Sequence, residues 1–220
     1  NIATFEMERK NYPMLNRACN PLQKPSAPIT GRDMSELRTG LRNPEKANVI
    51  LRGEPGSGKT AYTQGFAYDK DSTQYFVLVV DVERLAKDTE GDKDSEIANG
   101  LMDLVEEVSD YSRAHDLIMI LFMDEFHRIS MLSPSSVEAV KPILEKSAAN
   151  GFRIIAATTF EEYDQWISPN RALDQRLLPI NLPELPRDTV ITILKNRAIQ
   201  YGVMDVAEET VFDDIYDTSK

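Results

Sequence analysis

Short apolar runs alternate with longer amphipathic stretches along most of the chain. The runs are brief and rich in Val, Ile, Leu or Phe, as strands covered by helices on both faces are. They lie at residues 48–52, 75–81, 118–124, 153–158 and 178–182. The stretches between them favour helices and lie at residues 58–69, 95–112, 134–149, 160–168 and 187–202. This alternation predicts an α/β fold with a mostly parallel, five-stranded sheet flanked by helices.

The same pattern divides the chain into three parts. Residues 1–28 have little apolar periodicity and several prolines, which predicts an extended arm or linker. Residues 29–184 hold the alternating runs and form the expected large α/β domain. Residues 185–220 begin with a helical stretch and end soon after it, so we expect the truncated start of a small helical lid. A start without Met leads us to expect a fragment.

A glycine-rich segment lies between the first apolar run and the first helical stretch. It fits the pattern G-x-x-x-x-G-K-[ST] and consists of Gly53, Glu54, Pro55, Gly56, Ser57, Gly58, Lys59 and Thr60. In this pattern backbone N–H groups point inward at phosphates, and the following helix presents its positive end to them. We expect Lys59 to reach the β- and γ-phosphates and Thr60 to bind Mg²⁺. A glycine-rich turn that binds nothing is the alternative.

The third apolar run ends in two adjacent carboxylates, Asp124 and Glu125. We expect this strand beside the phosphate-loop strand, so that its end opens next to the γ-phosphate. Asp124 would then hold the Mg²⁺ shell, and Glu125 would polarise the attacking water as general base. The alternative is that the pair only ends a strand and starts a helix. We assign no role to His127, which follows.

The fourth apolar run ends in two hydroxyls, Thr158 and Thr159. Its place after the acidic pair suits a sensor that donates a hydrogen bond to the γ-phosphate or the attacking water, and we favour Thr159 for that role. The alternative is that two β-branched residues close the strand because of their strand propensity.

Charge and composition exclude several classes of protein. The chain has 25 Lys and Arg against 36 Asp and Glu, a formal charge of -11, which argues against binding to nucleic acid. The single Cys19 forms no internal disulfide, so a reducing, cytoplasmic setting is expected. The most apolar run, at residues 117–123, is much shorter than the roughly 20 residues of a membrane span. We expect no membrane span.

These segments resemble the Clp-type AAA+ ATPases, and most of all the first ATPase module of Clp unfoldases. The resemblance runs from about Ile29 to Lys220. It is carried by residues 29–33, which resemble the entry box beside the adenine, and by the nucleotide motifs at 53–60 and 122–127. The most specific part is the run at 156–163 followed by 172–177, which parallels the family's Ala-Thr-Thr, Glu-Tyr and Ala-Leu-Glu-Arg-Arg-Phe pattern without a gap.

The resemblance implies an AAA+ core in which ATP or ADP, with Mg²⁺, lies between neighbouring subunits of a hexameric ring. Ile29, Thr30 and Ala61 join the phosphate loop in binding the nucleotide. Arg176 is the arginine finger that reaches the neighbouring site, whereas Gln175 replaces the family's other arginine. The loop at 87–94 lacks the aromatic residue with which the family grips substrate, which puts threading in doubt. A solvated loop without a role is the alternative there.

Three functions fit this resemblance to different degrees. The first is an AAA+ motor that hydrolyses ATP and remodels or unfolds protein complexes. The second is an ATP-gated assembly or scaffold module with slow turnover and no polypeptide threading. The third, a DNA-dependent loader or initiator, is disfavoured by the acidic charge and by the Clp-like run at 156–177.

Overall fold

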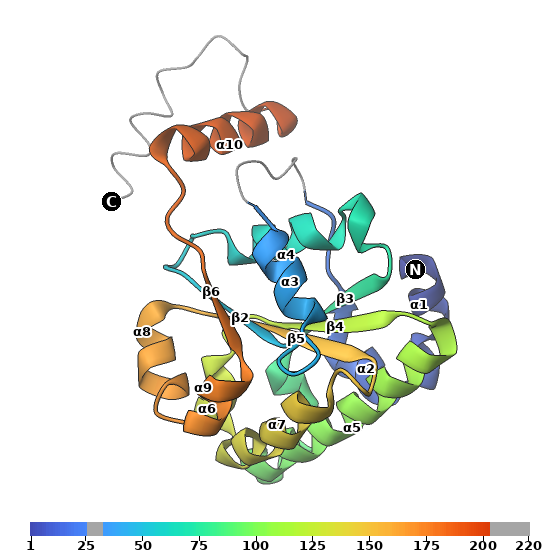
Figure 1. Ribbon diagram of the computed structural model, residues 1–220. Coiled ribbons are helices and arrows are strands. Elements are labelled where there is room, and N and C mark those ends of the chain that lie inside the picture. Colours follow the sequence, from blue (N-terminus) through green and yellow to red (C-terminus); the bar gives the residue numbers. More distant parts are fainter. Residues whose placement is uncertain (26–32, 203–220) are drawn as a thin grey trace.

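The computed structural model describes residues 1–25 and 33–202 (Figure 1). Its centre is a six-stranded sheet with the strand order β1-β3-β4-β5-β2-β6. Neighbouring strands are parallel except β1, which pairs antiparallel with β3. The strands are β1 (Cys19–Pro21), β2 (Val49–Arg52), β3 (Tyr75–Val80), β4 (Ile118–Met123), β5 (Phe152–Thr158) and β6 (Leu178–Asn181). The predicted α/β fold is confirmed, with one strand more than expected.

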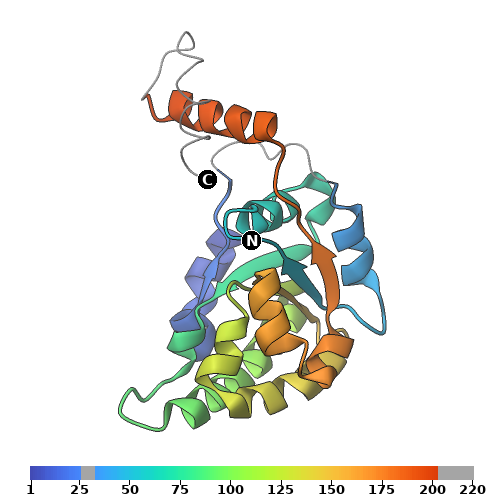
Figure 2. The ribbon, with the colours of Figure 1, turned by 90° about the vertical axis from the view of Figure 1, so that its left-hand side faces the viewer.

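Helices cover both faces of this sheet (Figures 1 and 2). One face carries α3 (Ser35–Arg42) and α4 (Lys59–Ala67). The other carries α2 (Pro13–Ala18), α5 (Lys93–His115), α6 (His127–Leu132), α7 (Pro134–Lys146) and α9 (Arg171–Arg176). The remaining helices are α1 (Ile2–Glu8), α8 (Phe160–Glu162), the π-helical η4 (Tyr163–Ile167), α10 (Arg187–Gln200) and the 3-10 turns η1 (Arg9–Asn11), η2 (Lys70–Ser72) and η3 (Val82–Leu85). Within the described ranges no helix is long and apolar enough to cross a membrane.

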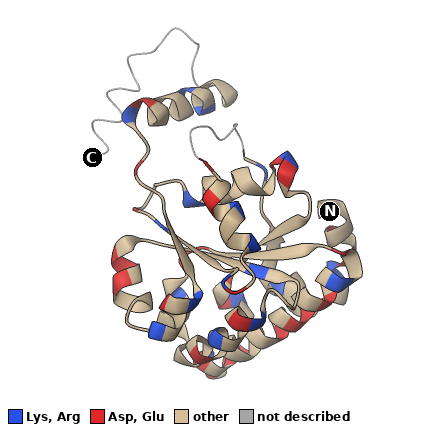
Figure 3. Cartoon of the chain, viewed as in Figure 1, with Lys and Arg blue, Asp and Glu red and all other residues tan. Residues whose placement is uncertain are grey.

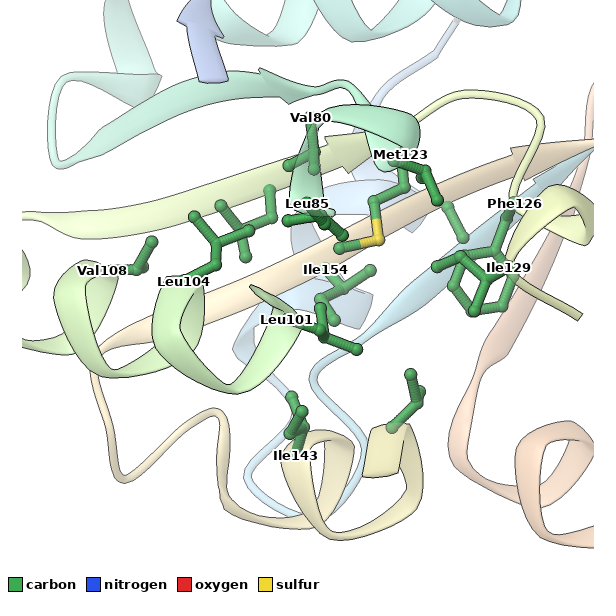
Figure 4. Packing of buried hydrophobic residues seen from close by; sticks show 14 of the residues in the cluster. Val80, Leu85, Leu101, Leu104, Val108, Met123, Phe126, Ile129, Ile143 and Ile154 are labelled. Atoms are coloured by element: carbon green, nitrogen blue, oxygen red, sulfur yellow. The ribbon is translucent and has the colours of Figure 1, made fainter. Parts of the chain in front are cut away.

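The strands divide their side chains between two hydrophobic clusters, one on each face of the sheet. In β4, Met119, Leu121 and Met123 belong to the cluster under α5 and α7, whereas Ile120 and Phe122 belong to the cluster under α3 and α4. This alternation follows from the period of two in a strand. Figure 4 shows the first cluster, in which side chains from α5, α7 and η3 meet β4 and β5. Burial on both faces explains why each run is apolar throughout.

The N-terminal segment is not an extended arm, so that prediction is wrong for the described residues up to 25. It forms α1, α2 and the edge strand β1. Phe5 is fully buried and packs edge-on against Phe76 and Tyr111, with ring centroids 5.5 and 5.7 Å apart. Glu107 of α5 accepts hydrogen bonds from the first-turn amides of α2, at 3.0 and 2.8 Å. The segment is ordered by these long-range contacts, which a short local pattern does not reveal.

The strand order also differs from the expectation for the acidic pair. β4 does not lie beside the phosphate-loop strand β2, because β5 pairs with both of them and separates them. The order of parallel strands depends on crossover connections that the sequence pattern leaves open. As a result, the end of β5, with Thr158, lies between the phosphate loop and Asp124.

Gly100 provides a test of the contact between α5 and η3. A Cβ atom on Gly100 would lie 1.9 Å from the carbonyl oxygen of Leu85 and 2.6 Å from its carbonyl carbon. Gly to Ala in a helix usually stabilises by about 1 kcal/mol. Here we expect Gly100→Ala to destabilise the fold by about 1–3 kcal/mol, because the backbone at Leu85 must move to make room for the added Cβ atom. Urea unfolding measures the change.

Gly40→Ala is the matched control in another helix. Its added Cβ would meet only side-chain methyl groups of Leu178 and Val49, at 2.7 and 3.1 Å. These side chains can shift, so we expect a smaller loss than for Gly100→Ala. A Gly100→Ala protein at least as stable as the parent would contradict the close packing of the two elements.

Candidate active site

A cavity of about 540 Å³ opens where β4 and β5 end and α4 begins. Five residues of the predicted phosphate loop line it, together with the residue that follows the loop and three predicted residues from the strand ends. They are Pro55, Gly56, Gly58, Lys59, Thr60 and Ala61, with Asp124, Glu125 and Thr159. The volume lies within the range of small-molecule sites, about 300–1,000 Å³. The carboxyl ends of parallel strands are where such folds bind ligands.

The loop before α4 has the backbone that the glycine pattern predicts. Gly56 and Gly58 have φ angles of 79° and 88°, in the left-handed region that glycine adopts without a steric penalty. Gly58 is also the N-cap residue of α4, and no side chain caps that helix. Uncapped N–H groups and the positive end of the helix dipole make this turn suited to an anion.

Lys59 is folded back onto its own loop. Its Nζ donates hydrogen bonds to the carbonyl oxygens of Gly53, at 2.8 Å, and Glu54, at 3.1 Å. Burial lowers the pKa of Lys59, and the nearby carboxylates of Asp124, Glu54 and Glu162 oppose that shift. Gly53 and Glu54 therefore touch the lysine rather than the cavity, and Ser57 is buried within the loop. The bonds of Lys59 are to neutral carbonyls, which a phosphate can replace with a stronger, charge-assisted pair.

The acidic pair forms a tight turn at the edge of the cavity. Asp124 Oδ1 accepts a hydrogen bond from the backbone N–H of Glu125, at 2.9 Å. Glu125 has a φ angle of 52°, which is uncommon for a residue other than glycine and costs about 1 kcal/mol or more. Its side chain is 62% exposed, and Arg128 Nη1 lies 3.8 Å from its Oε2. An exposed carboxylate on a strained turn beside a phosphate loop is well placed to contact water.

A polar network that the sequence did not reveal lines the same cavity. His127 Nδ1 lies 3.2 Å from the hydroxyl of Thr158, and its Nε2 lies 3.5 Å from Glu162. Thr159 caps α8 by accepting from the Glu162 N–H, and its hydroxyl donates to the Glu162 carboxylate. Thr158 is buried, whereas Thr159 is partly exposed, so Thr159 is the more accessible hydroxyl. Glu162, three residues after a capping Thr, has the spacing of a capping box, which is the signal that could have found it.

Two further residues line the cavity, and neither was predicted from the sequence. Gln64 lies four residues after Thr60 in α4, so helical spacing places both on one face. Arg197 reaches the cavity from α10, and no local pattern indicates this. The predicted adenine contacts Ile29 and Thr30 lie outside the described residues.

Arg176 does not line the cavity of its own chain. Its Nε donates to Glu145 of α7 at 2.9 Å, and its Nη1 donates to the Ala172 carbonyl at 3.0 Å. Gln175 beside it is exposed. The arrangement separates the predicted finger from the predicted phosphate loop within one chain.

Comparison with known proteins identifies the family to which the chain belongs. The family described as "ATPase family associated with various cellular activities (AAA)" matches residues 49–179. Heat shock protein 100 of Trypanosoma brucei brucei is 29% identical over 212 residues, which are 90% of this chain and 24% of that protein. Chaperone protein ClpB of Mycoplasma genitalium is 30% identical over 197 residues, 84% of this chain and 27% of that protein. The chain thus spans about a quarter of the length of these relatives.

Solved structures of Hsp104 have the same fold. An S. cerevisiae Hsp104–ADP complex superposes with a TM-score of 0.70 at 22% identity and covers 86% of this chain and 34% of that one. An extended S. cerevisiae Hsp104–casein complex gives 0.68 at 21% identity, over 86% and 34% of the two chains. At this identity the likeness supports the fold alone. The prediction of an ATP hydrolase is confirmed at the level of the family: the chain belongs to the AAA family of ATPases, and its relatives there are of the Clp/Hsp100 type.

Proposed function

We propose that the chain is the nucleotide-binding part of an AAA+ motor that hydrolyses ATP at the subunit interfaces of a ring and remodels protein complexes. The observation that carries the proposal is the division of the site. Lys59, Asp124, Glu125 and Thr159 meet at one cavity, whereas Arg176 lies outside it. An arginine finger that lies outside the cavity of its own chain is placed to act at the cavity of a second copy.

Mg²⁺ fits the oxygen groups at this cavity. Thr60 and Asp124 both line it, and a hydroxyl with one carboxylate is a common protein contribution to Mg²⁺ beside phosphates. The described residues hold no group of three or more His, Cys, Asp or Glu side chains that could bind a metal by themselves. Such a group is not needed, since phosphate oxygens and waters complete the shell. When bound, Mg²⁺ would neutralise charge on the β- and γ-phosphate oxygens.

The chain's own groups then divide the work of hydrolysis. The uncapped start of α4 and Lys59 would hold the phosphates, with Lys59 leaving the carbonyls of Gly53 and Glu54. Glu125 would take a proton from the attacking water. Thr159 would turn its hydroxyl from Glu162 toward the γ-phosphate or that water. The division 29–184 and 185–220 into a large domain and a lid belongs to the same proposal.

A protein substrate and a cytoplasmic location also belong to the proposal. The Hsp104 structure with casein concerns a neighbour in fold, and it makes a protein substrate reasonable. The loop after η3 is exposed at residues 87–92 and has no aromatic side chain, which supports the alternative of a scaffold module with slow turnover and no threading. Cys19 is buried, and burial raises the pKa of its thiol to about 12, so this thiol is poorly reactive. The cytoplasmic setting belongs to the same proposal.

Phosphate release at increasing protein concentration separates these two functions. A motor with shared sites gains specific activity as subunits associate, because each interface adds an Arg176. A scaffold module keeps a low, flat rate while it assembles. Light scattering under the same conditions shows whether association has occurred.

We expect Lys59→Ala to weaken ATP binding by at least about tenfold, because the loop loses a charge-assisted bond worth about 1.5–3 kcal/mol. Isothermal calorimetry measures the affinity. Lys146→Ala, an exposed lysine at the end of α7, is the control and should bind as the parent does. Equal affinity in both variants would show that the cavity is not the phosphate site.

A further inference from the structure

The phosphate loop and the helix that carries Arg176 are joined by a short path of side chains. We propose that Tyr163 is a positioning residue that couples the nucleotide state of a subunit to the Arg176 that the same subunit offers to its neighbour. The proposal rests on the proposed function, because it requires Arg176 to act in trans. The path runs from Arg52 through Tyr163 to Asp174.

The first step of the path begins at the phosphate loop. Arg52 is the last residue of β2 and directly precedes Gly53. Its guanidinium lies over the ring of Tyr163, 4.5 Å from the centroid, and its Nε donates to Asn181 of β6 at 2.9 Å. A guanidinium so close to a ring face is attracted by it, most strongly where water is excluded. Arg52 thus ties Tyr163 to the strand that enters the loop.

The second step leads from Tyr163 to α9. Tyr163 is 4% exposed, and its hydroxyl donates to the carboxylate of Asp174. Burial raises the pKa of Tyr163 to about 12, with the hydrogen bond and charge of Asp174 as further causes, so the phenol remains a donor at neutral pH. A neutral donor to a carboxylate is a charge-assisted bond, among the stronger hydrogen bonds in proteins. Asp174 lies two residues before Arg176 in the same short helix.

The third step concerns Arg176 itself. Its guanidinium donates to the carbonyl of Ala172, one turn back in α9, and to Glu145 of α7, so its direction follows the orientation of α9 against α7. The helix has only six residues and is held at its start by the Asn170 cap. Tyr163–Asp174 is the side-chain bond that holds its other half to η4. A shift of β2 when phosphate binds would therefore reach α9 through Tyr163.

The backbone at Tyr163 supports a role beyond packing. Tyr163 begins η4, a single π-helical segment that follows α8 directly. Such segments are rare and occur frequently at functional sites. The N-cap residue of α8 is Thr159, which lines the cavity, so η4 has a second connection to the nucleotide site. A ring that only filled space could be Phe, and this difference is what the experiment uses.

The experiment mixes two variants. Each is expected to be inactive when it assembles only with copies of itself. Arg176→Ala subunits keep an intact cavity, and Glu125→Gln subunits keep an intact Arg176. An interface that pairs the first cavity with the second Arg176 regains hydrolysis. Adding Tyr163→Phe to the Glu125→Gln donor should lower the regained activity by about threefold to tenfold, because Arg176 is held less well. Tyr68→Phe in the donor is the matched control, since its hydroxyl donates to Leu22 O at 2.6 Å, outside the described cavity and α9.

The nucleotide state of the donor tests the coupling itself. Donors that also carry Lys59→Ala hold no ATP, and they should support less activity than ATP-filled donors. Tyr163→Phe should remove this difference, which a purely structural role of the ring would leave in place. Energy transfer between labelled subunits confirms equal mixing. If Tyr163→Phe lowers the melting temperature, Asp174→Ala repeats the test from the other partner, and Asp174→Asn, which keeps an acceptor oxygen, should restore most of the activity.

The outcomes separate this inference from the proposed function. If mixing Arg176→Ala with Glu125→Gln restores nothing, the trans role of Arg176 fails. If it restores activity and Tyr163→Phe donors match Tyr68→Phe donors, Tyr163 does not position Arg176 and the inference is overturned. The inference would also be overturned if Tyr163→Phe donors that hold ATP still support more hydrolysis than Tyr163→Phe donors that hold none.

Discussion

Arg176→Ala is expected to abolish the ATPase activity that the chain gains on association, while the ATP affinity of the dilute monomer stays unchanged. The affinity should persist because Arg176 is outside its own cavity and pairs with Glu145. The activity should fall because an arginine finger stabilises charge on the transferred phosphoryl group, which is worth about 10³–10⁵ in rate in other systems. Gln175 does not replace it, since an amide has no full charge.

Phosphate release across a range of protein concentrations measures this effect. Arg171→Ala is the matched control, an exposed arginine at the opposite end of α9, and its activity should rise with concentration as in the parent. Activity of Arg176→Ala that rises in the same way would show that the arginine only packs against α7. The ring interface would then need a different finger.

Glu125→Gln is expected to keep ATP binding and to lower the turnover number by about 10²–10⁴, the usual contribution of a general base. The amide keeps the shape of the side chain on its strained turn but does not accept a proton from water. Calorimetry measures binding, and phosphate release under saturating ATP measures turnover. Glu161→Gln, an exposed carboxylate on α8 that does not line the cavity, is the control and should hydrolyse normally.

Equal turnover of Glu125→Gln and the parent would remove Glu125 from the base role. Glu162 would then be the carboxylate to examine, because it lines the same cavity and holds the hydroxyl of Thr159.

The large features of the fold could be predicted from the sequence because they are local. Five apolar runs with strand length, each followed by a helical stretch, indicate strands buried on both faces, and all five are strands in the sheet. The phosphate loop was recognisable because its glycines satisfy positive φ angles at fixed spacing, as Gly56 and Gly58 do. Asp124 and Glu125 were recognisable because they end an apolar run. The catalytic roles given to these residues stay predictions.

What the sequence did not reveal depends on residues far apart in the chain. The N-terminal segment is helical because Phe5 packs against Phe76 and Tyr111 and because Glu107 accepts a hydrogen bond from the first turn of α2. β5 lies between β2 and β4 because crossover connections, which no local period encodes, decide the strand order.

The site shows the same division between local pattern and tertiary contact. The phosphate-loop pattern and the acidic pair were recognisable in the sequence, since each is a contiguous motif between a strand and a helix. Only the tertiary structure placed His127, Glu162 and Arg197 at the cavity, because they come from three separate helical segments that meet there. The structure also supplied the partner of Arg176, Glu145 on α7, which lies 31 residues earlier in the chain. Spacing along the chain predicts contacts within a motif, whereas contacts between motifs follow from packing.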